Sequence, residues 1–229
     1  MASGEVSRIA TIDEEAQSPM TNSLLDIRSA DWNPGGTPAV AILLHGFGSN
    51  ERDLTGLMPA FDSSLPWASL RAPIDLGGGR SAWFEITTPG NPDAEPVLAA
   101  TDTIWDWVDA NIDPSTPVIP IGFSQGGLMA SQLLRTRPER VLATVILGGF
   151  VLGAAQPGDP SLASELPPVF WGRGAQDTVI GHPAIERTSE FLPRHSALVE
   201  RVYPGLAHGI SSEELDDVVA FVADATASR

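Results

Sequence analysis

The sequence has no cysteine among its 229 residues. This absence excludes a disulfide framework, a cysteine nucleophile and a metal site built from thiolates. It does not decide the redox compartment, because chains without cysteine occur in all of them.

Basic residues are also scarce, with 13 Lys and Arg against 29 Asp and Glu and a formal net charge of −16. A surface of this sign repels phosphate backbones, so we expect no nucleic-acid partner. It also disfavours docking on anionic membranes. The charge favours solubility but carries no information about the fold.

Long apolar runs are missing as well. No stretch approaches the ~18 consecutive apolar residues of a membrane span, so we expect no stable membrane insertion. Residues 1–20 lack the basic start and apolar run of a secretory signal, which makes the cytoplasm the default location. These residues are polar, and we expect them to be frayed or to form an edge hairpin with residues 24–28.

What the sequence does contain is typical of one globular domain. Hydrophobic residues make up 42% of the chain, close to the usual globular share. No internal repeat is visible, and no linker rich in Pro, Gly and Ser divides the chain. We therefore predict a single domain over residues 21–229.

Short apolar runs alternate with longer amphipathic stretches along the chain. The pattern predicts strands over residues 39–44, 67–70, 117–121, 141–147, 169–171 and 198–202. It predicts helices over residues 95–110, 125–135 and 183–192, and a last helix capped by Ser211 with Glu214 at capping-box spacing. This alternation favours an α/β fold with a mostly parallel central sheet and helices on both faces. Ligand sites in such sheets lie at the carboxyl ends of the strands.

The motif Gly122-Phe-Ser-Gln-Gly126 follows one predicted strand and precedes a predicted helix. This is the strand–turn–helix context of the nucleophile in an α/β-hydrolase fold. The turn is so sharp that side chains two positions either side of the serine would collide, which explains the two glycines. The sequence predicts Ser124 as a nucleophile, although chance matches to this short pattern are not rare.

A serine nucleophile needs a base, and three histidines follow Ser124 in the chain. His208 lies in a loop between the last predicted strand and the last helix, where this fold places its base. His195 is in a segment typical of a solvated turn, and His182 precedes a helix. We predict His208 as the base.

The base in turn needs a carboxylate to orient it. Asp177 sits just past the carboxyl end of a predicted strand, which favours it. The main rival is Asp159 in a Gly-Asp-Pro turn, where aspartate commonly bonds its own backbone. Glu165 precedes the strand and would lie at the wrong end of the sheet.

An oxyanion hole is predicted from two backbone N–H groups. In this architecture one donor comes from the loop after an early strand, here His45-Gly-Phe-Gly48, and the other from the residue after the nucleophile. These donors are Phe47 and Gln125. His45 is interpreted as a structural histidine rather than a second base.

With these motifs in place, the chain resembles the phospholipase/carboxylesterase family of α/β-hydrolases, which includes acyl-protein thioesterases. The matching pieces span residues 43 to the C-terminal helix, and Gly122-Phe-Ser-Gln-Gly-Gly127 is the most specific of them. The resemblance implies an esterase without metal or cofactor, and it places the triad and the oxyanion donors on the same residues. The chain departs from the family pattern at Gly209, where glutamate is common, and at Thr178-Val-Ile-Gly-His182, where a Pro-rich segment is common.

Four large apolar residues near the loops after strands are candidates for an acyl pocket, with core packing an equal alternative for each. They are Leu54, Trp83, Phe84 and Phe150. Gly77-Gly-Gly79 is interpreted as a flexible loop near the entrance.

The function predicted from these features is a serine carboxylesterase that hydrolyses small-to-medium acyl or aryl esters through an acyl-enzyme intermediate. An acyl thioesterase or a lysophospholipase would use the same residues. A hydrolase-fold protein that binds a ligand without catalysis is the alternative from another class. The only partner expected is a small ester substrate. A homodimer is possible, but no residue in the sequence indicates one.

Overall fold

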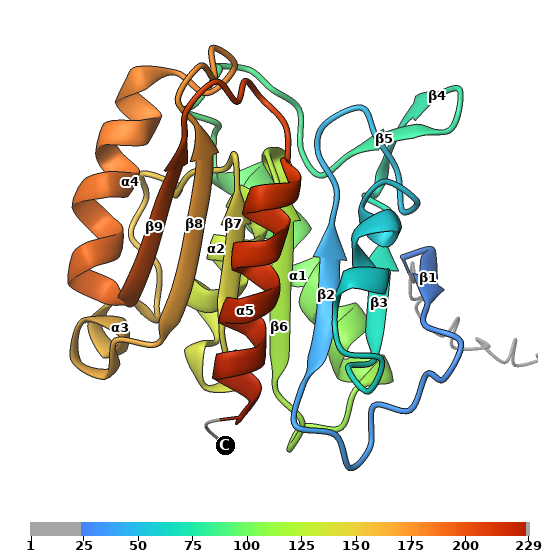
Figure 1. The fold of residues 1–229 in the computed structure, drawn as a ribbon. Coiled ribbons are helices and arrows are strands. Elements are labelled where there is room, and N and C mark those ends of the chain that lie inside the picture. Colours follow the sequence, from blue (N-terminus) through green and yellow to red (C-terminus); the bar gives the residue numbers. More distant parts are fainter. Residues whose placement is uncertain (1–23, 228–229) are drawn as a thin grey trace, which may run out of the picture.

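A seven-stranded sheet forms the centre of the computed structural model, which describes residues 24–227 (Figure 1). The first edge strand is antiparallel to its neighbour, and all other pairs are parallel. The mostly parallel sheet predicted from the alternating pattern is therefore confirmed. In spatial order the strands are β1 (Asp26–Arg28), β3 (Trp67–Leu70), β2 (Val40–Leu44), β6 (Val118–Phe123), β7 (Thr144–Leu147), β8 (Pro168–Gly174) and β9 (Ala197–Tyr203).

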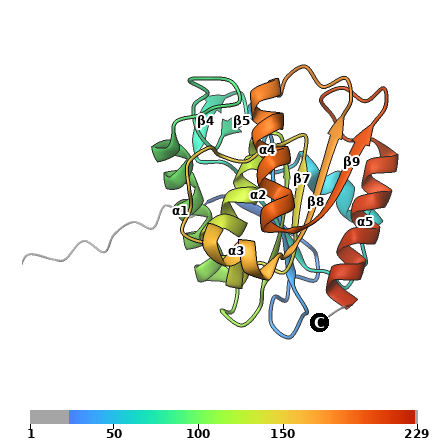
Figure 2. The same cartoon turned by 90° about the vertical axis from the view of Figure 1, so that its left-hand side faces the viewer.

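Helices cover both faces of the sheet, as Figure 2 shows with α5 on one side and the other α-helices opposite. Each face has its own apolar core, one centred on Trp105 and Trp171 and the other on Phe170 and Val218. The central strands are buried on both sides, which is why they read as unbroken apolar runs. One face carries α1 (Ala94–Asn111), α2 (Gln125–Thr136), α3 (Asp159–Glu165) and α4 (His182–His195); the other carries α5 (Ser212–Ala227) and the 3₁₀ helix η1 (Leu54–Ala60).

Within residues 24–227, several elements have no counterpart in the sequence prediction: η1, a second 3₁₀ helix η2 (Pro138–Arg140), α3, and a hairpin of β4 (Ile74–Gly77) and β5 (Arg80–Ala82). The flexible loop expected at residues 77–79 lies at the turn of this hairpin. All three glycines have φ between 63° and 78°, a region that glycine enters without steric cost. They close the turn between the two strands.

A strand is present within residues 24–28, as predicted. Its core, β1, pairs with β3 at the sheet edge, with Ile27 opposite Ser69. The predicted pairing with residues 1–20 lies outside the described residues. Within residues 24–227, no helix combines the length and the apolar character needed to cross a bilayer.

The start of α5 realises only half of the predicted capping box. The Ser211 hydroxyl accepts the backbone N–H of Glu214 at 3.1 Å. The Glu214 carboxyl is fully buried against Gly172, and neither of its oxygens makes a hydrogen bond of standard geometry with the described residues. Burial raises the pKa of Glu214 to about 7, against a smaller lowering by the nearby Ser211 N–H, and the charge of Asp217 raises it further.

We expect the stability of the protein to fall as pH rises because Glu214 must lose its proton inside the core. The folded-state pKa lies above the unfolded value, so the loss begins near the unfolded pKa of 4.5 and is complete above about 7. The loss amounts to at most about 3–4 kcal/mol, since one pKa unit corresponds to ~1.4 kcal/mol. Thermal unfolding of wild type and Glu214→Gln between these pH values measures it. A pH dependence that is the same in both proteins would contradict this expectation.

Candidate active site

Ser124 occupies a tight turn between β6 and α2, with φ 55° and ψ −115°. A non-glycine residue rarely adopts such a backbone, and strain of this kind gathers at functional sites. A Cβ atom at Gly122 would collide with the Gly126 carbonyl, and one at Gly126 would collide with the Leu44 carbonyl. The two glycines are therefore required for the close approach that the motif predicts.

A chain of two hydrogen bonds leads away from this serine. The Ser124 hydroxyl lies 2.8 Å from Nε2 of His208, and Nδ1 of His208 lies 2.7 Å from Oδ2 of Asp177. The other carboxyl oxygen of Asp177 accepts the backbone N–H groups of Val179 and Ile180 at 2.8 and 3.2 Å. These contacts fix the carboxylate, and the carboxylate fixes the imidazole ring. The structure thus brings together the three side chains selected from the sequence.

Two neighbouring parallel strands lead into the loops that carry Asp177 and His208. Asp177 follows β8 and His208 follows β9, and these strands pair up to Gly174 opposite Tyr203. A Cβ atom at Gly174 would collide with the carbonyls of Leu206 and Ala207. This glycine therefore lets the loop that carries His208 lie directly against the loop that carries Asp177. Sequence reasoning missed it, because its role depends on which strand lies beside β8.

The imidazole of His208 is held on two sides. Its ring centroid lies 4.9 Å from that of Phe123. Gly148, with φ 51°, leaves room below the ring, since a Cβ atom there would approach Cε1 of His208 to 3.4 Å. The His208 side chain is 17% exposed, so its imidazole remains accessible from solvent.

The rival acids lie elsewhere. Asp159 forms a two-pronged ion pair with the buried Arg135, with both N···O distances 2.8 Å. It also accepts the backbone N–H of Gln156, and it begins α3 rather than a free turn. Glu165 ends α3 just before β8, at the end of the sheet away from Ser124, as predicted.

The two other histidines after Ser124 have structural partners. His182 is exposed and lies 3.0 Å from Glu186 on the same helix. His195 belongs to the last turn of α4, where it stacks on Phe191 at 3.9 Å and bonds the Phe191 carbonyl. The prediction of a solvated turn at His195 was wrong, because the helix continues through Pro193 and half-buries the ring.

The loop after β2 approaches Ser124. A Cβ atom at Gly46 would lie 3.5 Å from Cβ of Ser124. The Phe47 N–H has no acceptor among the described residues. The Gln125 N–H opens α2, where backbone N–H groups have no partner within the helix. Both N–H groups are therefore without an acceptor among the described residues, and both residues line the same pocket as Ser124.

His45 supports this loop from below. It is fully buried, and burial lowers its pKa. Nδ1 lies 2.7 Å from the Gly46 carbonyl, while Nε2 lies 3.1 Å from both the Ala72 N–H and the Ser81 hydroxyl. A neutral ring with its proton on Nδ1 satisfies all three partners. The interpretation of His45 as a structural residue fits these contacts.

An apolar pocket of about 280 Å³ opens beside Ser124. Phe84 and Phe150 line it, as expected from the sequence, and so does the side chain of Phe47. The remaining walls come from the loop after β5 and the loop after Asp177, with Ile86, Thr88, Pro89, Gly90, Pro92, Val179 and Ile180. The exposed apolar residues Phe47, Ile86 and Val179 form its rim.

Trp83 and Leu54 do not line this pocket, which corrects their assignment as substrate-binding residues. Trp83 is 1% exposed, and its indole N–H donates to the His45 carbonyl. Leu54 packs in the core under η1 on the opposite face of the sheet. The loops that carry them reach the site, but these two side chains turn into the core.

A role of the Gln125 side chain was not predicted. Its amide accepts the Trp83 N–H at 2.9 Å and donates to the Phe84 carbonyl at 2.8 Å. The Gln125 side chain therefore holds the backbone of residues 83–84 against the start of α2.

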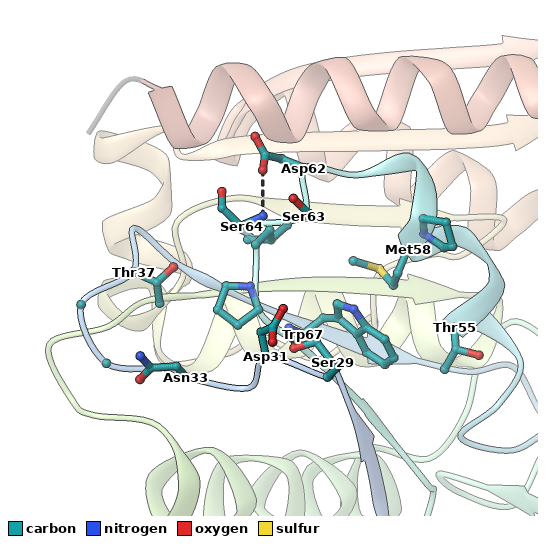
Figure 3. Close-up of a pocket in the computed structure, with 16 residues that line it drawn as sticks. Ser29, Asp31, Asn33, Thr37, Thr55, Met58, Asp62, Ser63, Ser64 and Trp67 are labelled. Carbon is teal, nitrogen blue, oxygen red and sulfur yellow. Dashed lines mark hydrogen bonds between the residues drawn. The ribbon is translucent and has the colours of Figure 1, made fainter.

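A larger cavity of about 610 Å³ lies at the other end of the sheet, where Thr37 and Trp67 precede or begin strands (Figure 3). Figure 3 shows Asp62, Ser63 and Ser64 beside it, with Asp62 accepting the Ser64 N–H. None of the described residues that line it is a histidine. Its serines therefore lack a base, and the cavity does not suit acyl transfer.

No group of three or more metal-ligating side chains forms a site within residues 24–227. The apolar pocket beside Ser124 is correspondingly lined by carbon, with hydroxyl and amide groups at its inner end. Beside this pocket, the hydrogen-bond chain of Ser124, His208 and Asp177 contains a hydroxyl, an imidazole and a carboxyl group.

Comparison with known proteins agrees with this geometry. The family model described as phospholipase/carboxylesterase matches residues 35–226. An acyl-protein thioesterase 1 from Kluyveromyces lactis is 30% identical over 209 residues, covering 81% of this chain and 91% of the relative. The carboxylesterase SOBER1 from Arabidopsis thaliana is 27% identical over 203 residues, covering 78% and 87%.

Solved structures share the fold. A carboxylesterase from Bacillus cereus superposes with a TM-score of 0.73 at 20% identity, covering 89% of this chain and 95% of that one. The crystal structure of Arabidopsis SOBER1 F65L superposes with a TM-score of 0.69 at 23% identity, covering 82% and 99%. The chain belongs to the phospholipase/carboxylesterase family of α/β-hydrolases and is a carboxylic ester hydrolase.

Proposed function

We propose that this protein is a serine esterase that cleaves small-to-medium acyl esters with Ser124, His208 and Asp177 as its catalytic triad. The observation that carries the proposal is the unbroken hydrogen-bond chain from the Ser124 hydroxyl to the Asp177 carboxylate. The Ser124 end of this chain faces an apolar pocket that suits an acyl chain.

The proposed reaction has two halves. The Ser124 oxygen attacks the ester carbonyl carbon while Nε2 of His208 takes the hydroxyl proton, and the same proton then goes to the leaving alcohol. Water attacks the acyl-enzyme with His208 again as base, and the acid is released. Asp177 holds Nδ1–H throughout and stabilises the imidazolium that forms.

The tetrahedral intermediates carry a negative oxygen, for which the N–H groups of Phe47 and Gln125 are the proposed donors. Such preorganised donors are each worth ~3 kcal/mol in the transition state. The Gln125 donor also stands at the N-terminus of α2, whose dipole favours negative charge.

The pocket supports a short-to-medium acyl group as the substrate portion. Its volume of about 280 Å³ lies at the lower end of the ~300–1,000 Å³ usual for small-molecule sites. The apolar lining offers nothing for a charged or sugar-like acyl group. An acyl thioesterase is the second candidate, because relatives bear that name and thioester cleavage needs the same groups.

We expect kcat/KM for p-nitrophenyl esters to rise with acyl length until the pocket is filled and then to fall. Each methylene buried in the pocket adds ~0.8 kcal/mol, or about fourfold. Steady-state kinetics with acetate to dodecanoate esters measures the profile, and acyl thioesters of matched length separate the two candidates. A flat profile would contradict an acyl-binding role for this pocket.

A further inference from the structure

One arginine side chain joins two walls of the apolar pocket. Arg187 projects from α4, and its Nη2 donates to the Gly90 carbonyl at 2.7 Å while its Nε donates to the Val151 carbonyl at 2.9 Å. Gly90 itself lines the pocket, and Val151 directly follows Phe150, which lines the facing wall. These walls are far apart in the chain, and the guanidinium spans them.

The surroundings of Arg187 hold its guanidinium in place. It lies 5.8 Å from the ring centroid of Phe150, on which it packs from outside the pocket. No carboxylate in residues 24–227 forms an ion pair with it. Burial lowers the pKa of Arg187, and the nearby Arg135 lowers it further. The two carbonyls therefore compensate for the partial desolvation of the charge, and their positions are coupled to it.

The two walls do not depend on Arg187 equally. Val151 has a second bond to α4, because its N–H donates to the Thr188 hydroxyl at 3.0 Å. The loop of residues 85–93 has bonds within itself, such as Thr87 to Asp93. Among the described residues, the Arg187 guanidinium supplies the side-chain hydrogen bond that links this loop, at Gly90, to another element.

This loop also packs closely against α4 at Gly90. Gly90 has φ 72°, and a Cβ atom there would lie 3.2 Å from Cβ of Ala184. The loop has no regular secondary structure between β5 and α1. Without the arginine, the loop would keep this packing contact with α4. It would lose the hydrogen bond at Gly90, the one side-chain hydrogen bond between this loop and α4 among the described residues.

We propose that Arg187 is a positioning residue that sets the size of the acyl pocket by holding residues 85–93 against α4. The inference rests on the proposed function, in which this pocket binds the acyl group. Arg187 does not touch the reacting atoms. Its loss lets the outer wall move while Ser124, His208 and Asp177 keep their geometry.

The substitution Arg187→Met keeps the length of the side chain and removes both donors. We expect KM for the preferred p-nitrophenyl ester to rise about tenfold, because the pocket wall that binds the acyl group is no longer held in place, with kcat changed less than about threefold. We also expect the preferred acyl length to shift to longer chains. Arg194→Met is the matched control, because Arg194 is exposed on the same helix and its variant should keep the wild-type profile.

Arg187→Lys keeps the charge and can reach only one carbonyl at a time, so it should fall between wild type and Arg187→Met. This variant also keeps the test valid if Arg187→Met fails to fold. An unchanged acyl profile in a folded variant, or a fall in kcat that is uniform across acyl lengths, would overturn the inference. A wild-type protein without esterase activity would instead overturn the proposed function.

Discussion

Replacement of Ser124 by alanine is expected to lower kcat for ester hydrolysis by about 10⁴-fold or more, with little change in KM. The variant loses the oxygen that forms the acyl-enzyme, while the pocket that binds the acyl group stays intact. The residual rate would come from substrate binding and the oxyanion donors acting on water. Steady-state kinetics on the preferred p-nitrophenyl ester measures the effect.

Ser131→Ala is a matched control on α2, the helix that follows Ser124. Ser131 is buried, and its hydroxyl donates to the Leu128 carbonyl within α2. Its loss therefore tests helix stability without touching the reaction, and kcat should stay within about twofold of wild type. Turnover by Ser124→Ala close to that of Ser131→Ala would reject Ser124 as the nucleophile.

Replacement of Asp177 by asparagine should lower kcat by about 10³- to 10⁴-fold. One oxygen of Asp177 accepts the N–H groups of Val179 and Ile180, and the other faces Nδ1 of His208. An asparagine would keep its carbonyl oxygen on the two N–H groups, which turns its NH₂ toward His208. Nδ1 would then have to accept, the ring proton would move to Nε2, and the ring could no longer accept the proton of Ser124.

Asp159→Asn is the paired control, because Asp159 was the rival acid in the sequence. Its carboxylate pairs with Arg135, whose side chain is 3% exposed. Breaking this pair should cost about 3 kcal/mol of stability, since it leaves a buried charge without compensation, but kcat should be unchanged. Thermal unfolding and kinetics on both variants should therefore give opposite patterns. A loss of kcat in Asp159→Asn alone would assign the acid to Asp159.

The site could be predicted from the sequence because each residue of the proposed triad follows the carboxyl end of a strand in the parallel part of the sheet. The carboxyl ends of parallel strands lie at one edge of the sheet, so Ser124, Asp177 and His208 had to be neighbours once the strands were located. The glycines flanking Ser124 added a second signal, since their close contacts depend only on the local turn.

The pocket could not be predicted to the same degree. Trp83 and Phe84 are adjacent in the sequence and both apolar, yet Phe84 lines the pocket and Trp83 turns into the core. The Trp83 indole bonds the His45 carbonyl in the core, and the backbone of both residues bonds the Gln125 side chain, about forty residues later in the chain. The bonds of Arg187 to Gly90 and Val151 could not be predicted either. Their acceptors are backbone carbonyls, which every residue has, so the residue types do not reveal the partners.

Labelling with an alkyl fluorophosphonate followed by peptide mass spectrometry tests most directly whether the imidazole at position 208 activates the hydroxyl at position 124. The structure predicts one adduct, on Ser124, formed quickly in wild type and far more slowly in His208→Ala. A folded protein that hydrolyses esters but carries the adduct on another residue, or that labels Ser124 equally fast without the imidazole, would contradict the proposed triad.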